Sequence, residues 1–430
     1  MALSANDRAI AGFAMTGHGL VHWFETSVPI FLVVWLAEFD VSNVLVGLVV
    51  ALGYAPFGIG ALPAGILADR FGPKTLVVAC LAGMSASFVI LGLTGSLAGV
   101  AVGLVCWGAA ASIYHPAGLS LISTGVEQRG RVFAWHGMAG NAGIALGPFV
   151  AATLMAVGLP WQRAALVLAV PGVLAAIYGL TADFDSTAAV DDETDADADE
   201  VLSLGDLLTD SRTLFASAFA LVFVIVTFEG LFYRGMLTYL PEILHGSDAL
   251  AGFDPGQTLR GIEPGDYIYV GLLVVGIVGQ YVGGRLTDRI TPARGLLSFF
   301  AVLAVLALAY VPVLSLGGGG PTALGAVIAL SAIFGFTLFA IQPFYQEAVA
   351  VYTPPESRGL SYGYTYLGEF GLGAVSIAIG GVVLDISTPT FLATMAGFAV
   401  VGAGLSVVLA VGLDTILGGG SASSPASANE

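Results

Sequence analysis

Long apolar runs recur along this 430-residue chain at nearly regular intervals. A helix needs about 20 apolar residues to cross the hydrocarbon core of a bilayer. Only 10% of the residues are charged, whereas soluble proteins carry about 25%. The sequence therefore predicts an all-α membrane protein with twelve transmembrane helices, which centre near Glu25, Ala55, Ser85, Gly108, Ala142, Pro171, Thr227, Val275, Leu303, Ile333, Gly371 and Val401.

Basic residues are divided unequally between the two sides of the predicted membrane. The side that faces away from the N-terminus carries only Arg163 and Arg260. Cytoplasmic loops are enriched in Lys and Arg, so we expect a multi-pass protein of the cell membrane with both termini in the cytoplasm. The basic residues on that side are Arg8, Arg70, Lys74, Arg129, Arg131, Arg212, Arg285, Arg289, Arg294 and Arg358.

The acidic residues are concentrated in one segment. Eleven carboxylates lie between Asp183 and Asp210, and the net charge of −17 argues against nucleic-acid binding. We interpret the segment as a solvated linker and not as a binding site. The predicted organisation is a six-helix bundle over 1–182, an acidic cytoplasmic linker over 183–211, a second bundle over 212–416 and a disordered cytoplasmic tail over 417–430.

The two predicted bundles resemble each other in sequence. Phe24-Glu25 aligns with Phe228-Glu229 at an offset of 204, and Pro116 aligns with Pro343 at an offset of 227. Because the offset grows only in predicted loops, we infer a duplication that gives two pseudo-symmetric halves. Parallel repeats of this kind form transporters whose substrate site lies between the halves near the bilayer midplane.

A short polar motif occurs once in each half. The stretch from Gly65 to Lys74, GILADRFGPK, resembles the cytoplasmic loop signature of the major facilitator superfamily, and the stretch from Gly284 to Arg289, GRLTDR, is its second copy. An aspartate at a helix end beside basic residues can cap neighbouring helices and form ion pairs. The interpretation as plain membrane anchoring stays open, but we favour cytoplasmic gating by Asp69, Arg70, Lys74, Asp288 and Arg289.

A narrower resemblance rests on three stretches. YHPAG from Tyr114 to Gly118, the Gly-rich run that ends at Pro148, and RGMLTYLP from Arg234 to Pro241 look like the fosmidomycin-resistance group of exporters. This resemblance implies proton-coupled export of a small anionic or amphiphilic compound. Two alternatives stay open: a proton symporter that imports an organic anion, and a transporter-like sensor without transport.

Ionisable side chains inside membrane helices are costly and therefore functional by default. His18, His22 and Glu25 are spaced so that all three project from one face of the first span. A carboxylate beside an imidazole in this setting can load and release a proton near neutral pH. Local hydrogen bonding of the histidines is the alternative, but we favour proton coupling.

The eleventh span repeats the same spacing with Tyr362, Tyr366 and Glu369. We predict Glu369 as a second proton-coupling residue and Tyr366 as a substrate contact. The position equivalent to Glu369 in the first half is Asn141, which is also polar. A polar contact between packed helices is the alternative explanation.

Arg234 is the basic residue inside a span, and its fork of donors suits a carboxylate or a phosphonate. It could pair with Glu25 or Glu369 in one conformation and with a substrate in another, and a permanent buried ion pair is an equal alternative. The further predicted substrate-binding residues are Glu229, His115, Tyr114, Asn141, Gln342, Tyr345 and Gln346.

Other chemistries find little support in the sequence. Histidine with carboxylate suits a transition metal, but no Cys/His-rich loop accompanies His18, His22 and His115, so we predict no metal site and no cofactor. No nucleophile stands beside a base, which argues against an enzyme. We expect a monomer that meets only the bilayer, a small-molecule substrate and protons.

Overall fold

The computed structural model describes residues 3–189, 204–251, 263–317, 320–353 and 358–412. Every regular element in these ranges is a helix. Eleven helices are long and apolar enough to cross a membrane, and the pair Asn43–Ile59 and Ala61–Ala68, bent by 40°, gives a twelfth. The prediction of twelve transmembrane helices in two bundles is confirmed.

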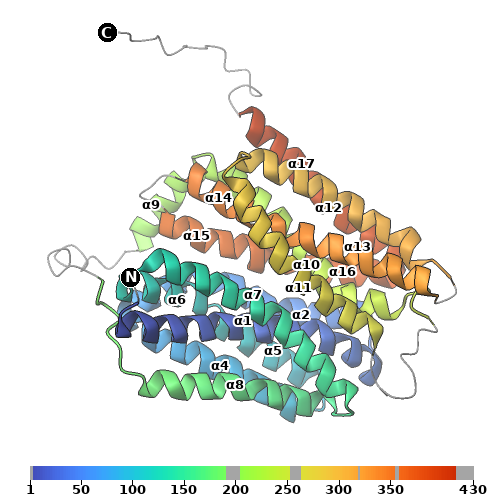
Figure 1. Ribbon diagram of the computed structural model, residues 1–430, viewed down its shortest axis with the longest axis horizontal. Helices are drawn as coiled ribbons and strands as arrows, with labels where there is room; N and C mark the ends of the chain where they lie inside the picture. The colour runs from blue at the N-terminus through green and yellow to red at the C-terminus, as the bar shows by residue number, and fades with distance from the viewer. Residues whose placement is uncertain (1–2, 190–203, 252–262, 318–319, 354–357, 413–430) are drawn as a thin grey trace, which may run out of the picture.

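The first half occupies the lower part of Figure 1, and its helices run side by side across the view. It is built from α1 (Ala5–Glu38), α2 (Asn43–Ile59), α3 (Ala61–Phe71), α4 (Pro73–Leu93), α5 (Leu97–Ala111), α6 (Tyr114–Gly125), α7 (Arg129–Ala156) and α8 (Trp161–Thr181).

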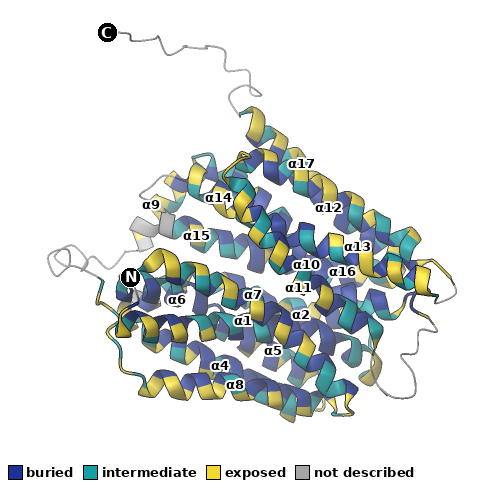
Figure 2. Ribbon diagram, in the orientation of Figure 1, coloured by how far each residue is buried: buried dark blue, intermediate teal, exposed yellow. Residues whose placement is uncertain are grey.

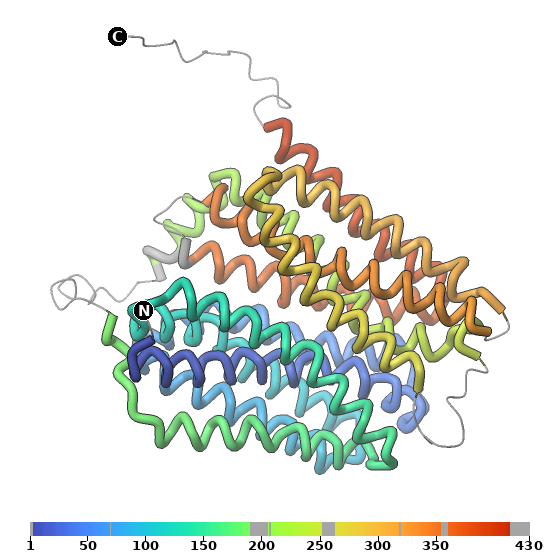
Figure 3. The backbone as a smooth tube through the Cα atoms, viewed as in Figure 1, coloured from blue at the N-terminus to red at the C-terminus, as the bar shows by residue number. Residues whose placement is uncertain are grey.

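The second half lies above the first, and the colour ramp of the tube separates the two halves clearly (Figure 3). It comprises α9 (Leu204–Phe215), α10 (Phe219–His245), α11 (Pro264–Thr287), α12 (Pro292–Leu314), α13 (Pro321–Ala340), α14 (Gln342–Tyr352), α15 (Arg358–Tyr366), the π-helical turn η3 (Leu367–Leu372), α16 (Val375–Ile386) and α17 (Thr388–Val411).

The linker predicted over 183–211 contains the start of a helix, because α9 begins at Leu204. Residues 190–203 of that linker, and all of the tail predicted over 417–430, lie outside the described residues.

The internal repeat is visible where helices break. Span four is interrupted between α5 and α6, just before Pro116, and span ten is interrupted between α13 and α14, just before Pro343. Proline lacks the N–H that would continue the helical ladder. The two aligned prolines thus interrupt equivalent helices in the two halves.

Two lines of contact join the halves beside the contacts at the cavity. On one line, α2 runs against η3 and α16, and the Asp385 carboxylate accepts hydrogen bonds from the N–H groups of Asn43 (3.1 Å) and Val44 (3.4 Å). On the other line, the rings of Phe149 on α7 and Tyr267 on α11 meet at 6.2 Å. Both contacts lie at the end of the bundle opposite the N-terminus, so this end is closed.

Burial follows the expected pattern for a membrane protein. The outward faces of the peripheral helices expose many large apolar side chains, and the faces between helices are buried (Figure 2). A lipid environment accounts for such exposure, because acyl chains are as apolar as these side chains.

Candidate functional site

A cavity of about 640 Å³ lies between the two halves. Its wall takes residues from α1, α6 and α7 of the first half and from α10, α11, α14, α15 and η3 of the second. It extends from Glu25 toward Ser123 near the end of α6 and Val349 near the end of α14. The N-terminal residue Asp7 contacts the α6–α7 connection through the N–H of Glu127 (3.3 Å). The cavity therefore extends toward the end where the chain begins.

Glu25 is fixed by an interruption of its own helix. Pro29 lies four residues later in α1 and has no N–H to donate to the Glu25 carbonyl. Instead the hydroxyl of Tyr54 on α2 donates to this carbonyl at 2.7 Å. A buried backbone carbonyl needs a partner, so the proline and the tyrosine together tie α1 to α2 at the level of the cavity.

A second hydroxyl that donates to a carbonyl left free by a proline ties α1 to α7. Pro148 leaves the carbonyl of Ile144 without its helical donor. The hydroxyl of Thr26, next to Glu25, donates to Ile144 O at 2.9 Å and is also 2.6 Å from the His22 carbonyl oxygen. The face of α1 that carries the ionisable residues is thereby held at a fixed position within the first half.

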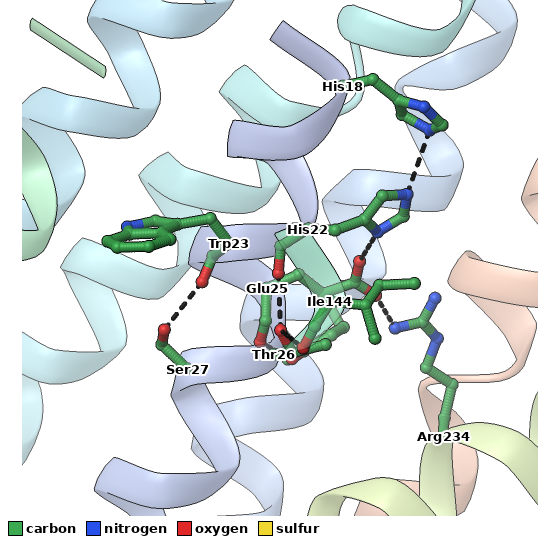
Figure 4. A network of polar contacts seen from close by, with 9 residues as sticks. His18, His22, Trp23, Glu25, Thr26, Ser27, Ile144 and Arg234 are labelled. Atoms are coloured by element: carbon green, nitrogen blue, oxygen red, sulfur yellow. Dashed lines mark hydrogen bonds and ion pairs between the residues drawn. The ribbon is translucent and has the colours of Figure 1, made fainter. Parts of the chain in front are cut away.

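An ion pair joins the two halves at the inner end of the cavity. Arg234 of α10 donates through Nη1 to Glu25 Oε1, and both side chains are buried (Figure 4). The guanidinium also lies 4.1 Å from the ring centroid of Phe370. Its Nε forms no hydrogen bond within the described residues. Of the two partners open to Arg234 in the sequence, Glu25 is the one it meets in this state.

Glu369 lies in the π-helical turn η3 and lines the cavity. π-Helical turns inside α-helices often occur at functional sites. The hydroxyl of Tyr345 on α14 donates to Glu369 Oε2 at 2.8 Å. The predicted substrate contact Tyr345 and the predicted proton site Glu369 are thus one hydrogen-bonded unit.

Glu229 and Tyr114 are placed differently from the other predicted site residues. Neither lines the cavity. Glu229 is 1% exposed, and its carboxylate oxygens form no hydrogen bond within the described part of the chain. Tyr114 is fully buried, donates to the carbonyl of Ala14, and stacks on His18 at 5.7 Å. In this state Glu229 has no contact with the cavity, and Tyr114 supports the histidines from behind.

The histidines form one cluster in the first half. His22 Nδ1 is 2.6 Å from Glu25 Oε2, and His22 Nε2 is 3.2 Å from His18 Nε2. His18 stacks on His136 with ring centroids 3.9 Å apart. His115 reaches the cluster from α6 and lies 4.6 Å from the Tyr366 ring of the other half. The proton-coupling roles of His18, His22 and Glu25 stay predictions.

Polar side chains of both halves complete the wall. The predicted residues Asn141, Gln342, Gln346 and Tyr366 all line the cavity. Sequence reasoning missed Gln280 on α11, whose Oε1 is buried without a hydrogen-bond partner among the described residues. A single amide within an otherwise apolar span was the available signal for Gln280.

The predicted gating residues lie at the ends of α3, α4 and α11. Lys74 donates to the carbonyl of Ala182 at 2.5 Å and covers the Phe184 ring at 4.7 Å. Arg70 lies 5.4 Å from the Phe71 ring. Asp288 and Arg289 are exposed and enter no ion pair within the described ranges. The side chain of Asp69 lies outside the described residues.

Comparison with known proteins identifies the architecture. The family model described as Major Facilitator Superfamily matches residues 14–376. A bacterial homologue of the human lysosomal transporter Spinster, in an inward-facing and unoccupied conformation, has a TM-score of 0.72 at 14% identity, covering 99% of this chain and 100% of that one. The nucleoside transporter NupG gives 0.66 at 14% identity, covering 94% and 98%. No curated protein matches.

Proposed function

The chain belongs to the major facilitator superfamily, and on that premise we propose that it exports a small anionic or amphiphilic compound in exchange for protons. Family membership makes it a multi-pass membrane transporter and not an enzyme. The observation that carries the proposal is the cavity between the halves, with the Arg234–Glu25 ion pair at its inner end.

The substrate site that we propose centres on Arg234. Its guanidinium lines the cavity, retains an Nε–H without a partner among the described residues, and is matched in shape to a carboxylate or phosphonate. Phe370, Tyr233 and Tyr366 add aromatic surface to the same wall. An anionic group on an apolar body therefore suits the site, since binding pockets combine apolar walls with a few placed polar groups.

Alternating access supplies the transport step. In this state the end with the α2–Asp385 and α7–α11 contacts is closed, and the cavity extends toward the other end. If the N-terminus is cytoplasmic, as the basic residues favour, this is the state in which an exporter loads its substrate. Rocking of the halves would then close the end that carries Arg70, Lys74, Asp288 and Arg289, and we propose that their ion pairs with Asp69 and other carboxylates form there.

Glu369 is the residue that we propose as the proton carrier. It belongs to the cavity wall, and its carboxylate accepts a hydrogen bond from the Tyr345 hydroxyl. We propose that a donor group of the substrate binds Glu369 Oε1, the oxygen that Tyr345 does not contact, at the position that the proton would occupy, so substrate and proton exclude one another. This exclusion is the requirement for antiport.

A second candidate, symport of an organic anion with a proton, is favoured by the charges around the cavity. Arg234 faces two carboxylates, Glu25 and Glu369, in the same wall. A purely anionic substrate adds a third negative charge, which a proton on Glu369 would offset. Anion and proton would then bind together and move in one direction.

Flux in proteoliposomes discriminates between these functions. Vesicles with an imposed pH gradient and an internal pH dye are given fosmidomycin, a small phosphonate, and a set of organic carboxylates. Opposite movement of protons and compound supports antiport, and movement in one direction supports symport. If neither the compound nor protons move, both antiport and symport are contradicted. That result is the one expected of a sensor without transport.

The variant Glu369→Gln tests the proton carrier. We expect it to exchange compound across the membrane in the absence of a gradient but to lose accumulation driven by the pH gradient. Glu347→Gln on α14 is the matched control, because Glu347 is exposed and is not part of the cavity wall. Unchanged gradient-driven accumulation in Glu369→Gln would remove Glu369 from this role.

A further inference from the structure

Four side chains form a continuous polar chain from one half to the other (Figure 4). Arg234 bonds to Glu25, Glu25 contacts His22 Nδ1 at 2.6 Å, and His22 Nε2 lies 3.2 Å from His18 Nε2. The chain ends at the carbonyl of His136, 2.8 Å from His18 Nδ1. The contact between the two histidine rings is the unusual member of this chain.

The neighbours of the two histidines determine which ring nitrogens carry protons. A backbone carbonyl can only accept, so His18 Nδ1 must donate to His136 O. The Glu25 carboxylate is paired with Arg234 and accepts as well, so His22 Nδ1 donates to it. In the neutral rings both Nε2 atoms are then left with lone pairs, and these lone pairs face each other at 3.2 Å. Such a contact is repulsive unless a cation lies between the two atoms.

A third histidine faces the same point. One ring nitrogen from each of His18, His22 and His115 can be chosen so that all three lie within 4.8 Å of one another. His115 is 6% exposed, and neither of its ring nitrogens has a hydrogen bond within the described residues. Because His115 lines the cavity, its ring nitrogens are open to an additional ligand at this point.

In contrast to the expectation from the sequence, which was no metal site, we propose that His18, His22 and His115 bind one divalent transition-metal ion, such as Zn²⁺, Co²⁺ or Ni²⁺, in the wall of the cavity. Ligand nitrogens about 2.0–2.1 Å from a tetrahedral ion lie about 3.3–3.4 Å apart, close to the 3.2 Å between the two Nε2 atoms. Imidazole nitrogens favour these ions over Mg²⁺ or Ca²⁺.

The partners of His18 and His22 are of the kind that metal-bound histidines usually have. Metal-bound histidines usually donate their other N–H to a carboxylate or a backbone carbonyl. Glu25 serves His22 in this way, and the carbonyl of His136 serves His18. Three protein ligands leave a fourth position for water or an oxygen of a bound anion. The metal site extends the proposed function but does not depend on it.

Cobalt spectroscopy on the full chain, purified without a polyhistidine tag, tests the proposal. Tetrahedral Co²⁺ absorbs visible light through d–d transitions, so titration with Co²⁺ alone gives occupancy and affinity. We expect one Co²⁺ per chain, displaced by Zn²⁺. His18→Ala and His115→Phe should each weaken binding at least tenfold, and the phenyl ring of the second variant preserves packing against Phe57 and Tyr366.

His245→Ala is the matched control, because His245 is a histidine of the second half that pairs with Asp266 at 2.9 Å, away from the cluster. Its Co²⁺ affinity should equal that of the unsubstituted chain. Absence of the Co²⁺ bands, or binding by His115→Phe and His18→Ala as tight as that of the unsubstituted chain, would overturn the proposal and leave a shared proton as the cation between His18 and His22. Intact gradient-driven flux together with that result would leave the proposed function standing.

Discussion

Pro29 and Tyr54 illustrate how single residues shape the site. The proline removes the helical partner of the Glu25 carbonyl, and the tyrosine hydroxyl replaces it at 2.7 Å. The two residues lie on different helices, α1 and α2, so this one hydrogen bond links a local sequence feature to the packing of the first half.

Tyr54→Phe should destabilise the protein by about 1–3 kcal/mol, because a buried carbonyl loses the hydroxyl that replaces its missing helical donor. The double variant Tyr54→Phe with Pro29→Ala should recover most of this loss, since an alanine in place of the proline restores the N–H within the helix. Thermal unfolding in detergent measures both effects. A double variant as unstable as the sum of the two single variants would show that the carbonyl is not the cause.

Arg234→Lys tests the fork of donors at the cavity. Lysine keeps the positive charge beside Glu25 but cannot present two parallel donors to a phosphonate. The ligand is an anionic compound that the flux experiment has identified as transported. We expect its affinity, measured by calorimetry, to fall at least tenfold in Arg234→Lys, while membrane insertion and folding stay intact. Arg285→Lys, exposed on α11 beside Tyr281, is the control and should bind normally. Equal affinity in Arg234→Lys would remove Arg234 from the site.

At the scale of elements, the interface between α2 and η3 depends on glycine. A Cβ added at Gly58 would overlap the backbone N and Cα of Gly371 in the other half. Only glycine fits at position 58 while α2 and η3 lie this close together, because any other residue has a Cβ. The close contact also positions the turn that carries Glu369.

Gly58→Ala should therefore cost about 1–3 kcal/mol, the usual penalty for overpacking, or force the two helices apart. Gly397→Ala on α17 is the control, since its Cβ would meet nothing within 4 Å and alanine favours helix. A melting temperature of Gly58→Ala equal to that of Gly397→Ala would contradict the packing described here.

Hydropathy was sufficient to predict the twelve spans, because each span must be apolar over about 20 residues. The breaks before Pro116 and Pro343 were not predicted, since a proline inside a helix can kink or interrupt it. The π-helical turn at Glu369 was also missed, because it follows from packing against Gly58 and Gly230 and not from local sequence.

The residue types in the sequence were sufficient to predict most of the residues that line the cavity. They did not determine which ionisable side chains pair with one another. Arg234 and Glu25 are 209 positions apart, and the choice of Glu25 over Glu369 depends on how the halves meet. Glu229 shares its helix with Arg234 yet lies outside the cavity, because five residues of helix turn it away.

At the scale of the whole molecule, the cavity extends toward one end while contacts between the halves close the other. The Arg234–Glu25 pair lies between the cavity and the closed end. Removing one partner of a buried ion pair costs about 3–5 kcal/mol because the other charge is left uncompensated. Glu25→Gln should therefore shift the protein away from this state.

Spin-label distances at both ends test this account most directly. With exposed Cys106 replaced by serine, one pair of labels at Val157 and Glu263 reports the closed end, and a second pair at Glu127 and Val351 reports the open end. The account predicts that Glu25→Gln lengthens the first distance and shortens the second in equal fractions of molecules. Unchanged distances, or both ends widening together, would contradict it.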